Sequence, residues 1–321
     1  MIESFDAIIL AGGLRKSPLH DELRMHELCL PINDGRTLLD AWLETLGAGG
    51  GCKDAAIVVS DADDAHEIQR LLDESAAFRH DLPNVQVIVE RGRWRGTAGV
   101  LRDVADGMVG SEILVAVEAA CLPPSSLTPL LASIATGSEG VVGIGSHFDP
   151  AGVYGFRRSA LKHVPAVGYF DLKEQLLPEM YTRNAGVHAV RVTKKVIRLR
   201  DREGYLQAIS WLVGSEDNGE SRHCSSVTTI APSVRLVGTC LIDSNATLED
   251  GAIVRDSVVL DGAVVGIGAV VNRSVIGSGA VIAAGHVVTN AVVPCNRDLA
   301  RDHGMADSTV SSRTRVMASK S

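Results

Sequence analysis

The feature that most constrains this fold is an apolar residue that recurs every six positions through the C-terminal third of the chain. Small residues and glycines fill the positions between, as in LEDGAI, LDGAVV and IGSGAV. A period of six matches neither an amphipathic helix nor an alternating strand, so it predicts a parallel β-solenoid with three short strands per coil. The repeat supports about three coils over residues 227–295. Its apolar positions are Ile230, Leu236, Ile242, Leu248, Val254 and Leu260 and, after a shift of register, Val270, Ile276, Ile282 and Val288.

Residues 1–213 have a different pattern, in which strand-like and helix-like segments alternate. This alternation predicts an α/β domain with a parallel or mixed sheet and helices on both faces. The polar, Gly/Ser-rich residues 214–226 are predicted to be a linker, and residues 296–321 a C-terminal tail. The expected strands are residues 6–10, 55–60, 85–90, 113–117, 140–145 and 152–157, and helical patterns cover 37–46, 64–78 and 97–108.

Charge and composition exclude several classes of partner. The net charge of −8 argues against nucleic acid and against an anionic membrane surface. No stretch is long and apolar enough to span a bilayer, and the N-terminal MIESFDAIIL lacks the basic region of a signal peptide. The six cysteines include no Cys-x-x-Cys pair, so we expect buried thiols in a reduced, cytoplasmic protein.

The stretch AIILAGGLRKSPL, residues 7–19, begins as a nucleotide-binding loop does. Its apolar run ends at Leu10 and is typical of a buried parallel strand. Ala11, Gly12 and Gly13 follow at once, as in a tight turn where backbone approaches a ligand closely. Ligands of α/β sheets bind beyond the carboxyl ends of the strands, so this turn is the first place to expect a site.

A family resemblance rests on six segments in order: LAGG (10–13), LPINDGRTLLDAWLETL (30–46), RGTAGVL (95–101), AGVYGFRRSAL (151–161), YFDLKEQLLPEM (169–180) and REGYLQA (202–208). Together with the solenoid they resemble the sugar-phosphate nucleotidyltransferases, or NDP-sugar pyrophosphorylases. That resemblance implies a Rossmann-like nucleotidyltransferase domain, a left-handed β-helix, and the reaction of an NTP with a sugar 1-phosphate that releases pyrophosphate. It also implies nucleotide contacts at Leu10, Ala11, Gly12 and Gly13 and at Gly96, Thr97 and Ala98.

The phosphate-binding part of the resemblance is incomplete. The family loop LAGGxGTRL reads LAGGLRKSPL here and lacks the third glycine. Arg15 and Lys16 supply positive charge, and they are either phosphate ligands or solvated loop residues. The family's lysine before its LPV segment corresponds to Glu27, beside His26. Because a carboxylate repels phosphate, we expect Glu27 on a solvated surface or paired with a nearby base.

The metal-binding carboxylates that the resemblance implies are also replaced. The first corresponds to Ala120, in LVAVEAACL, and alanine has no ligand atom for Mg²⁺. Glu118, two positions earlier, is either a partial substitute or a hydrogen-bonded strand end. The second corresponds to Arg198, which either contacts a phosphate or lies exposed on an edge strand. Asp201 is nearby but three positions away, so we expect no bound Mg²⁺.

The sugar-binding contacts are shortened too. Family members carry two extra strands where Gly145 and Gly152 are almost adjacent here, and Pro150 replaces the family's asparagine. Losses at metal, phosphate and sugar predict a catalytically impaired homologue that acts as a regulatory or scaffolding subunit. Such a protein would bind a nucleotide or sugar nucleotide weakly at most.

Two other functions stay open at this point. One is an active nucleotidyltransferase with a site rebuilt around Arg15, Glu118 and Asp201. A more distant one is a hexapeptide-repeat acyltransferase with His286 as its base, although a lone histidine at a coil corner is more often structural. The flat coils, rich in Val, Ile and Ala, predict a homo-oligomer or a hetero-oligomer with an active paralogue.

Overall fold

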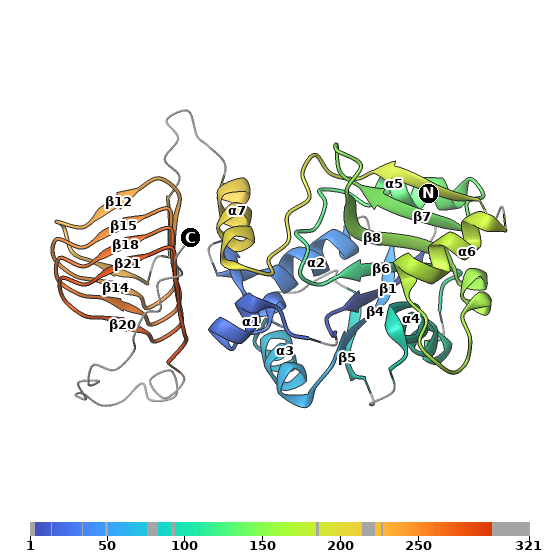
Figure 1. Cartoon of the computed structure of the whole chain (residues 1–321), viewed down its shortest axis with the longest axis horizontal. Coiled ribbons are helices and arrows are strands. Elements are labelled where there is room, and N and C mark those ends of the chain that lie inside the picture. Colours follow the sequence, from blue (N-terminus) through green and yellow to red (C-terminus); the bar gives the residue numbers. More distant parts are fainter. Residues whose placement is uncertain are drawn as a thin grey trace.

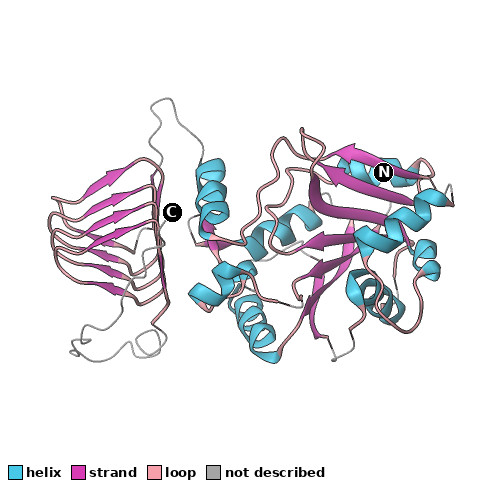
Figure 2. Ribbon diagram, viewed as in Figure 1, coloured by secondary structure: helices cyan, strands magenta, loops and turns pink. Residues whose placement is uncertain are grey.

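The computed structural model describes residues 4–13, 15–33, 35–48, 51–75, 83–90, 94–108, 110–183, 186–213, 222–225 and 227–296. A mixed α/β domain and a stack of short parallel strands lie side by side, with helix α7 (Arg202–Val213) between them (Figure 1). Figure 2 shows helices on both sides of the N-terminal sheet, and coils of strands joined by turns in the C-terminal region.

The sheet of the N-terminal domain is mixed, in the order β5-β4-β1-β6-β8-β7-β9. Strands β5, β4, β1 and β6 run parallel, and β8 is antiparallel to both β6 and β7. All six predicted strands are present within three residues of their expected bounds, and β9 is an addition. The bounds are β1 Phe5–Leu10, β4 Cys52–Val59, β5 Asn84–Val89, β6 Ile113–Glu118, β7 Gly140–Ile144, β8 Pro150–Arg157 and β9 Val187–Arg191, with a small β2 Pro31–Asn33 and β3 Arg36–Thr37.

Alternate residues of β1 belong to two separate apolar clusters, one on each face of the sheet. Ala7 and Ile9 pack with side chains of α1, α2, α3, α5 and α7, whereas Ile8 packs with those of α4 and α6. This two-sided burial is why the strand sequences are nearly continuous apolar runs. The helices are α1 Pro18–Leu23, α2 Leu38–Gly47, α3 Ala62–Ser75, α4 Gly96–Gly107, α5 Thr128–Ala135 and α6 Leu177–Thr182, with 3-10 turns at Glu27–Cys29 and Arg158–His163 and a π-helical turn at Leu172–Leu176.

The C-terminal region forms three stacks of parallel strands, in the orders β10-β13-β16-β19-β22, β11-β14-β17-β20 and β12-β15-β18-β21. The first strand, β10, lies within the segment that we predicted to be a linker. The bounds are β10 Arg222–Cys224, β11 Thr229–Ile230, β12 Arg235–Val237, β13 Cys240–Ile242, β14 Thr247–Leu248, β15 Ile253–Arg255, β16 Val258–Val259, β17 Val264–Val265, β18 Val270–Asn272, β19 Val275–Ile276, β20 Val281–Ile282, β21 Val287–Thr289 and β22 Val292–Val293.

The repeat length corrects two of the predicted inward positions. Val258 pairs with Val275, 17 residues later, so each such coil has spacings of six, six and five. Val259 and Val271 therefore belong to the interior cluster of the solenoid, whereas Leu260, equally buried, packs in the cluster shared with the N-terminal domain and Val270 is half-buried. The cause is a tight corner, because Asp256, Arg273 and Asn290 recur 17 residues apart with left-handed φ values of 44°, 47° and 51°.

One face of the solenoid packs against the N-terminal domain. Leu241, Val258 and Val275, on the stack that begins with β10, belong to the same buried cluster as Tyr205 and Ile209 of α7. The β-helix therefore buries one of its apolar faces within its own chain.

Candidate functional site

Two cavities adjoin the turn after β1, and both are lined by Leu10, Gly12 and Gly13. We call the smaller one, of about 300 Å³, the apolar cavity; its wall includes Val58, Glu90, Trp94, Arg95, Val100 and Tyr169. We call the larger one, of about 630 Å³, the charged cavity; it is lined by Arg15, Lys16, His20, Glu27, Asp61, Asp64, Glu118, Ala120, Asp171, Lys173 and Arg200.

The turn after β1 is tied to β4 by backbone and hydroxyl hydrogen bonds. The Ala11 N–H donates to Val58 O at 2.8 Å, and the Gly13 N–H donates to Ser60 Oγ at 2.7 Å. A Cβ on Gly12 would lie 2.7 Å from Ser60 Oγ and 3.0 Å from the Ser60 backbone nitrogen, so only glycine fits there. The Gly13 N–H, a predicted nucleotide contact, already has an acceptor within the protein.

The second predicted nucleotide segment, Gly96–Ala98, opens helix α4 and is bound to the segment before the π-helical turn. The N–H groups of Ala98 and Gly99 both donate to Phe170 O, at 3.1 and 3.2 Å. Thr97 Oγ1 donates to Asp171 Oδ2 at 2.9 Å. Gly96 and Thr97 line the apolar cavity, whereas Ala98 is fully buried. The third and fourth amides of α4 are therefore used by the chain itself.

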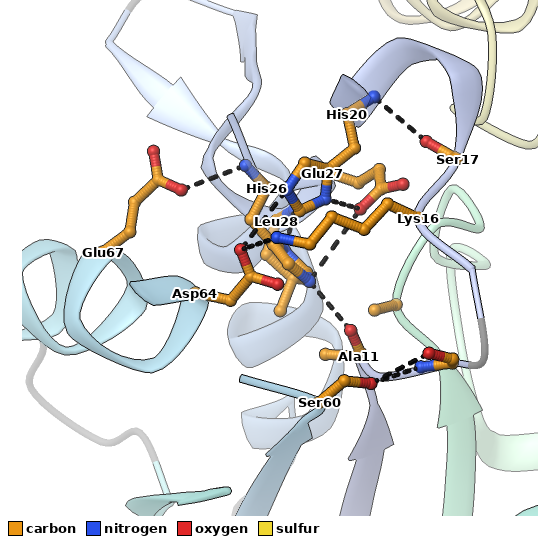
Figure 3. Close-up of polar contacts among 12 residues, drawn as sticks. Ala11, Lys16, Ser17, His20, His26, Glu27, Leu28, Ser60, Asp64 and Glu67 are labelled. Atoms are coloured by element: carbon orange, nitrogen blue, oxygen red, sulfur yellow. Dashed lines mark hydrogen bonds and ion pairs between the residues drawn. The ribbon is translucent and has the colours of Figure 1, made fainter. Parts of the chain in front are cut away.

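Figure 3 shows a polar network beside the turn that follows β1, in which His20, His26, Glu27 and Asp64 are buried. Lys16 Nζ lies 2.9 Å from Asp61 Oδ2 and 3.1 Å from Asp64 Oδ1. His20 joins Asp64 to Glu27, with Nε2 3.3 Å from Asp64 Oδ1 and Nδ1 3.7 Å from Glu27 Oε2. Although burial opposes its charge, the two aspartates raise the pKa of Lys16 above its ordinary value. The Lys16 ammonium is thus held in ion pairs, while its side chain stays 38% exposed at the wall of the charged cavity.

Glu27 is buried, which corrects the expectation of a solvated surface and fits the other expectation, that it pairs with a nearby base. Burial alone would raise its pKa, but hydrogen bonds with His20 and Ser17 and the electrostatic interaction with His26 lower the pKa to about 2. His26 Nδ1 accepts from the Leu28 N–H at 3.1 Å, so Nε2 carries the proton and donates to Ala11 O at 2.9 Å. The network therefore fixes the first residue of the loop.

Glu118, at the end of β6, is also paired. Its Oε1 lies 2.6 Å from Lys173 Nζ and accepts from the Tyr154 hydroxyl at 2.8 Å. Burial favours protonation, but Lys173 and Tyr154 outweigh it and hold the pKa of Glu118 below its ordinary value. Of the two sequence interpretations, the hydrogen-bonded strand end is the one that this geometry fits.

The two positions at which the resemblance implies metal carboxylates do meet in space. The Leu199 N–H donates to Ala120 O at 2.7 Å, and Cys121 and Arg198 form an isolated antiparallel bridge, so the segments of Ala120 and Arg198 lie side by side. Ala120 lines the charged cavity, but Arg198 is half-buried and donates from Nη2 to Pro150 O at 2.6 Å. The Arg198 guanidinium is therefore hydrogen-bonded to the Pro150 carbonyl and is not exposed on an edge strand.

Asp201, predicted as a substitute ligand, is bound at the start of α7 instead. Its Oδ1 accepts from the Gly204 N–H at 2.7 Å, as an N-terminal helix cap does. His286, the base of the acyltransferase hypothesis, is exposed, and its Nδ1 lies 3.4 Å from Ala284 O. The β7–β8 connection is a tight turn closed by a bond from Gly145 N to Asp149 O, so the extra hairpin expected of the family is absent there.

Arg15 and Arg200 are different, because neither guanidinium contacts a described carboxylate and both line the charged cavity. Arg200 was missed in the sequence, as were Lys173, Tyr154 and Glu90. Glu90 directly follows β5. Its place just after a strand is the one signal that could have indicated it, and the same signal identified Gly12. Lys173 lies 55 residues from its partner Glu118, and no local pattern marks that pairing.

Comparison with known proteins gives a match that covers the C-terminal region. The sequence model of a family described as GlmU-like, C-terminal hexapeptide matches residues 215–316. This match and the three stacks of parallel strands agree with a hexapeptide-repeat β-helix. No curated protein matches the chain. Within the described residues, no three His, Cys, Asp or Glu side chains are arranged to hold a metal ion, and no helix has the length and apolarity to cross a bilayer.

Proposed function

We propose that this chain is a sugar-phosphate nucleotidyltransferase homologue that binds a nucleotide without transferring it, and that it acts as a regulatory or scaffolding subunit. The GlmU-like match to the β-helix supports the family relation. The turn of Gly12 and Gly13, at the carboxyl end of β1, supports a nucleotide site at the apolar cavity.

The observation that carries the loss of catalysis is the pairing of Glu118 with Lys173. Nucleotidyl transfer needs metal-bound phosphates, and Ala120 and Arg198 stand where the family's metal ligands are implied. An alanine methyl and a guanidinium cannot ligate Mg²⁺. The residues present therefore do not fit the metal.

A second candidate is an active enzyme with a rebuilt phosphate site. Arg15 and Arg200 favour it, because two guanidiniums with no described carboxylate partner line one cavity, and arginine binds phosphate by paired hydrogen bonds. We rank it second because Lys16, Lys173 and Glu118 are each held by ion pairs in the same cavity. Two cations without a metal bind a polyphosphate but do not assemble the reaction.

Assembly through the β-helix is part of the same proposal. With one face covered by α7, the outward residues of the other two stacks include Val281 and Val287, which are 57% and 68% exposed. We propose that a second copy or an active paralogue covers one of these faces. In light scattering, Val281→Arg or Val287→Arg should turn an oligomer into a monomer. An intact chain that is already monomeric would remove the scaffolding role.

Nucleotide binding is tested by titrating the full chain with nucleoside diphosphates in a calorimeter, with and without Mg²⁺. We expect a dissociation constant of roughly 0.1–1 mM, because few charge-assisted contacts remain, and no dependence on Mg²⁺. Micromolar affinity that requires Mg²⁺ would favour the active enzyme. The absence of binding by every nucleotide would contradict the proposal.

A further inference from the structure

Glu90 is a carboxylate in the wall of the apolar cavity. It directly follows β5, and its backbone N–H donates to Val59 O at 2.8 Å, which fixes it at the carboxyl end of the sheet. It is half-buried and lines both the apolar cavity and the groove that continues between β5 and α4. A carboxylate in such a place needs hydrogen-bond donors to offset its lost hydration.

The described cation in that wall, Arg95, is bound to other partners. Arg95, which is 4% exposed, binds both oxygens of Asp103, with Nε–Oδ2 of 2.7 Å and Nη2–Oδ1 of 2.9 Å. Its remaining donors reach Gly168 O at 2.7 Å and Pro165 O at 2.9 Å. Burial and the neighbouring Asp103 together raise the pKa of Glu90. No described side chain forms an ion pair or hydrogen bond with the Glu90 carboxylate.

The other walls suit a flat aromatic ring. Val58 and Val100 are apolar, and Trp94 and Tyr169 are 72% and 51% exposed around the same cavity, so both rings are available for stacking. The hydroxyls of Ser60 and Thr97 are already hydrogen-bonded within the chain. Glu90 is thus the charged acceptor that the cavity offers to a ligand.

Resting on the nucleotide site proposed above, we infer that Glu90 selects guanine. A carboxylate presents two acceptors side by side, and guanine presents two neighbouring donors, N1–H and the exocyclic N2–H₂. In adenine and cytosine the amino group adjoins a ring-nitrogen lone pair, and in uracil and thymine the single N–H lies between two carbonyls. Each of these arrangements sets a lone pair against the carboxylate. The ligand class is therefore a guanine nucleotide.

The test compares GDP with inosine diphosphate, which lacks only the exocyclic amine, and with ADP and UDP, by calorimetry on the full chain at pH 7.5. A charge-assisted hydrogen bond contributes enough to favour GDP over inosine diphosphate by about tenfold or more. In Glu90→Gln the amide offers one acceptor, so the ratio should fall below about threefold. Glu112→Gln, at a side chain that is 91% exposed and outside the cavity, is the matched control and should keep the ratio.

The outcomes separate this inference from the proposal beneath it. Equal binding of GDP and inosine diphosphate by the unaltered chain overturns the guanine assignment and leaves nucleotide binding standing. An unchanged ratio in a folded Glu90→Gln variant overturns the role of Glu90. Failure of all four nucleotides to bind overturns both the guanine assignment and the nucleotide site. The first comparison needs no variant, so it holds even where Glu90→Gln does not fold.

Discussion

The ammonium Nζ of Lys173 lies 2.6 Å from Oε1 of Glu118. This ion pair engages the carboxylate that lies two residues before the implied metal position, Ala120. The Tyr154 hydroxyl donates to the same oxygen, so Lys173 and Tyr154 already neutralise and hydrogen-bond the Glu118 carboxylate. We expect crystals soaked in Mn²⁺ to show no anomalous peak within coordination distance of Glu118. A peak there would revive the active-enzyme interpretation.

Restoring the implied ligands should not restore the reaction. The double variant Ala120→Asp with Arg198→Asp supplies two carboxylates on segments that already lie side by side. The lysine implied at Glu27 and the sugar hairpin stay missing, so we expect little turnover in a pyrophosphate assay. Turnover in this variant well above that of the unaltered chain would show that only the metal ligands had been lost.

Arg200 and Lys16 should differ in their effect on triphosphate binding. Lys16 is held between Asp61 and Asp64, so Lys16→Gln should change the affinity for GTP by less than about twofold. Arg200 has no described carboxylate partner, so Arg200→Gln should lower the affinity for GTP by about threefold to tenfold and the affinity for GMP by less. Calorimetry on both variants decides, and the reverse order of effects would contradict this assignment of the phosphate contacts.

Glu27 should make stability depend on pH in acid. Its pKa is about 2 in the folded protein against 4.5 ordinarily, so between these values the unfolded chain binds more protons. The stabilisation is therefore complete above pH 4.5 and is lost as the pH falls toward 2. At pH 6 we expect Glu27→Gln to lower the free energy of unfolding by about 3 kcal/mol.

The control for that measurement is Glu22→Gln, at an exposed position of α1. It should change the free energy of unfolding by less than about 0.5 kcal/mol at every pH. The unaltered chain and Glu27→Gln should approach each other in denaturant titrations as the pH is lowered. A difference that stays constant from pH 6 to pH 3 would mean that the charge of Glu27 does not stabilise the fold.

Neighbouring valines test the 17-residue register of the β-helix. Val271 is fully buried and Val270 is half-buried, so Val271→Ala should cost about 2 kcal/mol and Val270→Ala less than about 1. Thermal unfolding of the two variants gives the comparison. A larger loss at Val270 would support an unbroken six-residue period instead.

The sequence predicted the solenoid because its apolar period is a local property of each hexapeptide. The register failed at Leu260 and Val270 because the corners at Asp256 and Arg273 are one residue shorter, and an aspartate or an arginine does not by itself specify a left-handed backbone. The strands of the N-terminal domain were predictable for the same local reason. Strand β9 was not, because three of its five residues are exposed and it lacks an apolar pattern.

The candidate site was only partly predictable. Gly12 follows from a short motif, and a Cβ there would meet Ser60, so the motif has a steric cause. Buried Glu27 is paired with His20. Lys16, in the same network, is paired with Asp64 of α3 and with Asp61, the residue before that helix. These are contacts between elements, and a charged residue read alone suggests a solvated surface.

The central claim is that the chain keeps a nucleotide site and has lost nucleotidyl transfer. A coupled assay of pyrophosphate release tests it, with the common NTPs and sugar 1-phosphates, in Mg²⁺, on the full chain. We predict no release above the protein-free control for any pair, including pairs that contain GTP. Sustained release for one pair, with a matching amount of sugar nucleotide formed, would contradict it.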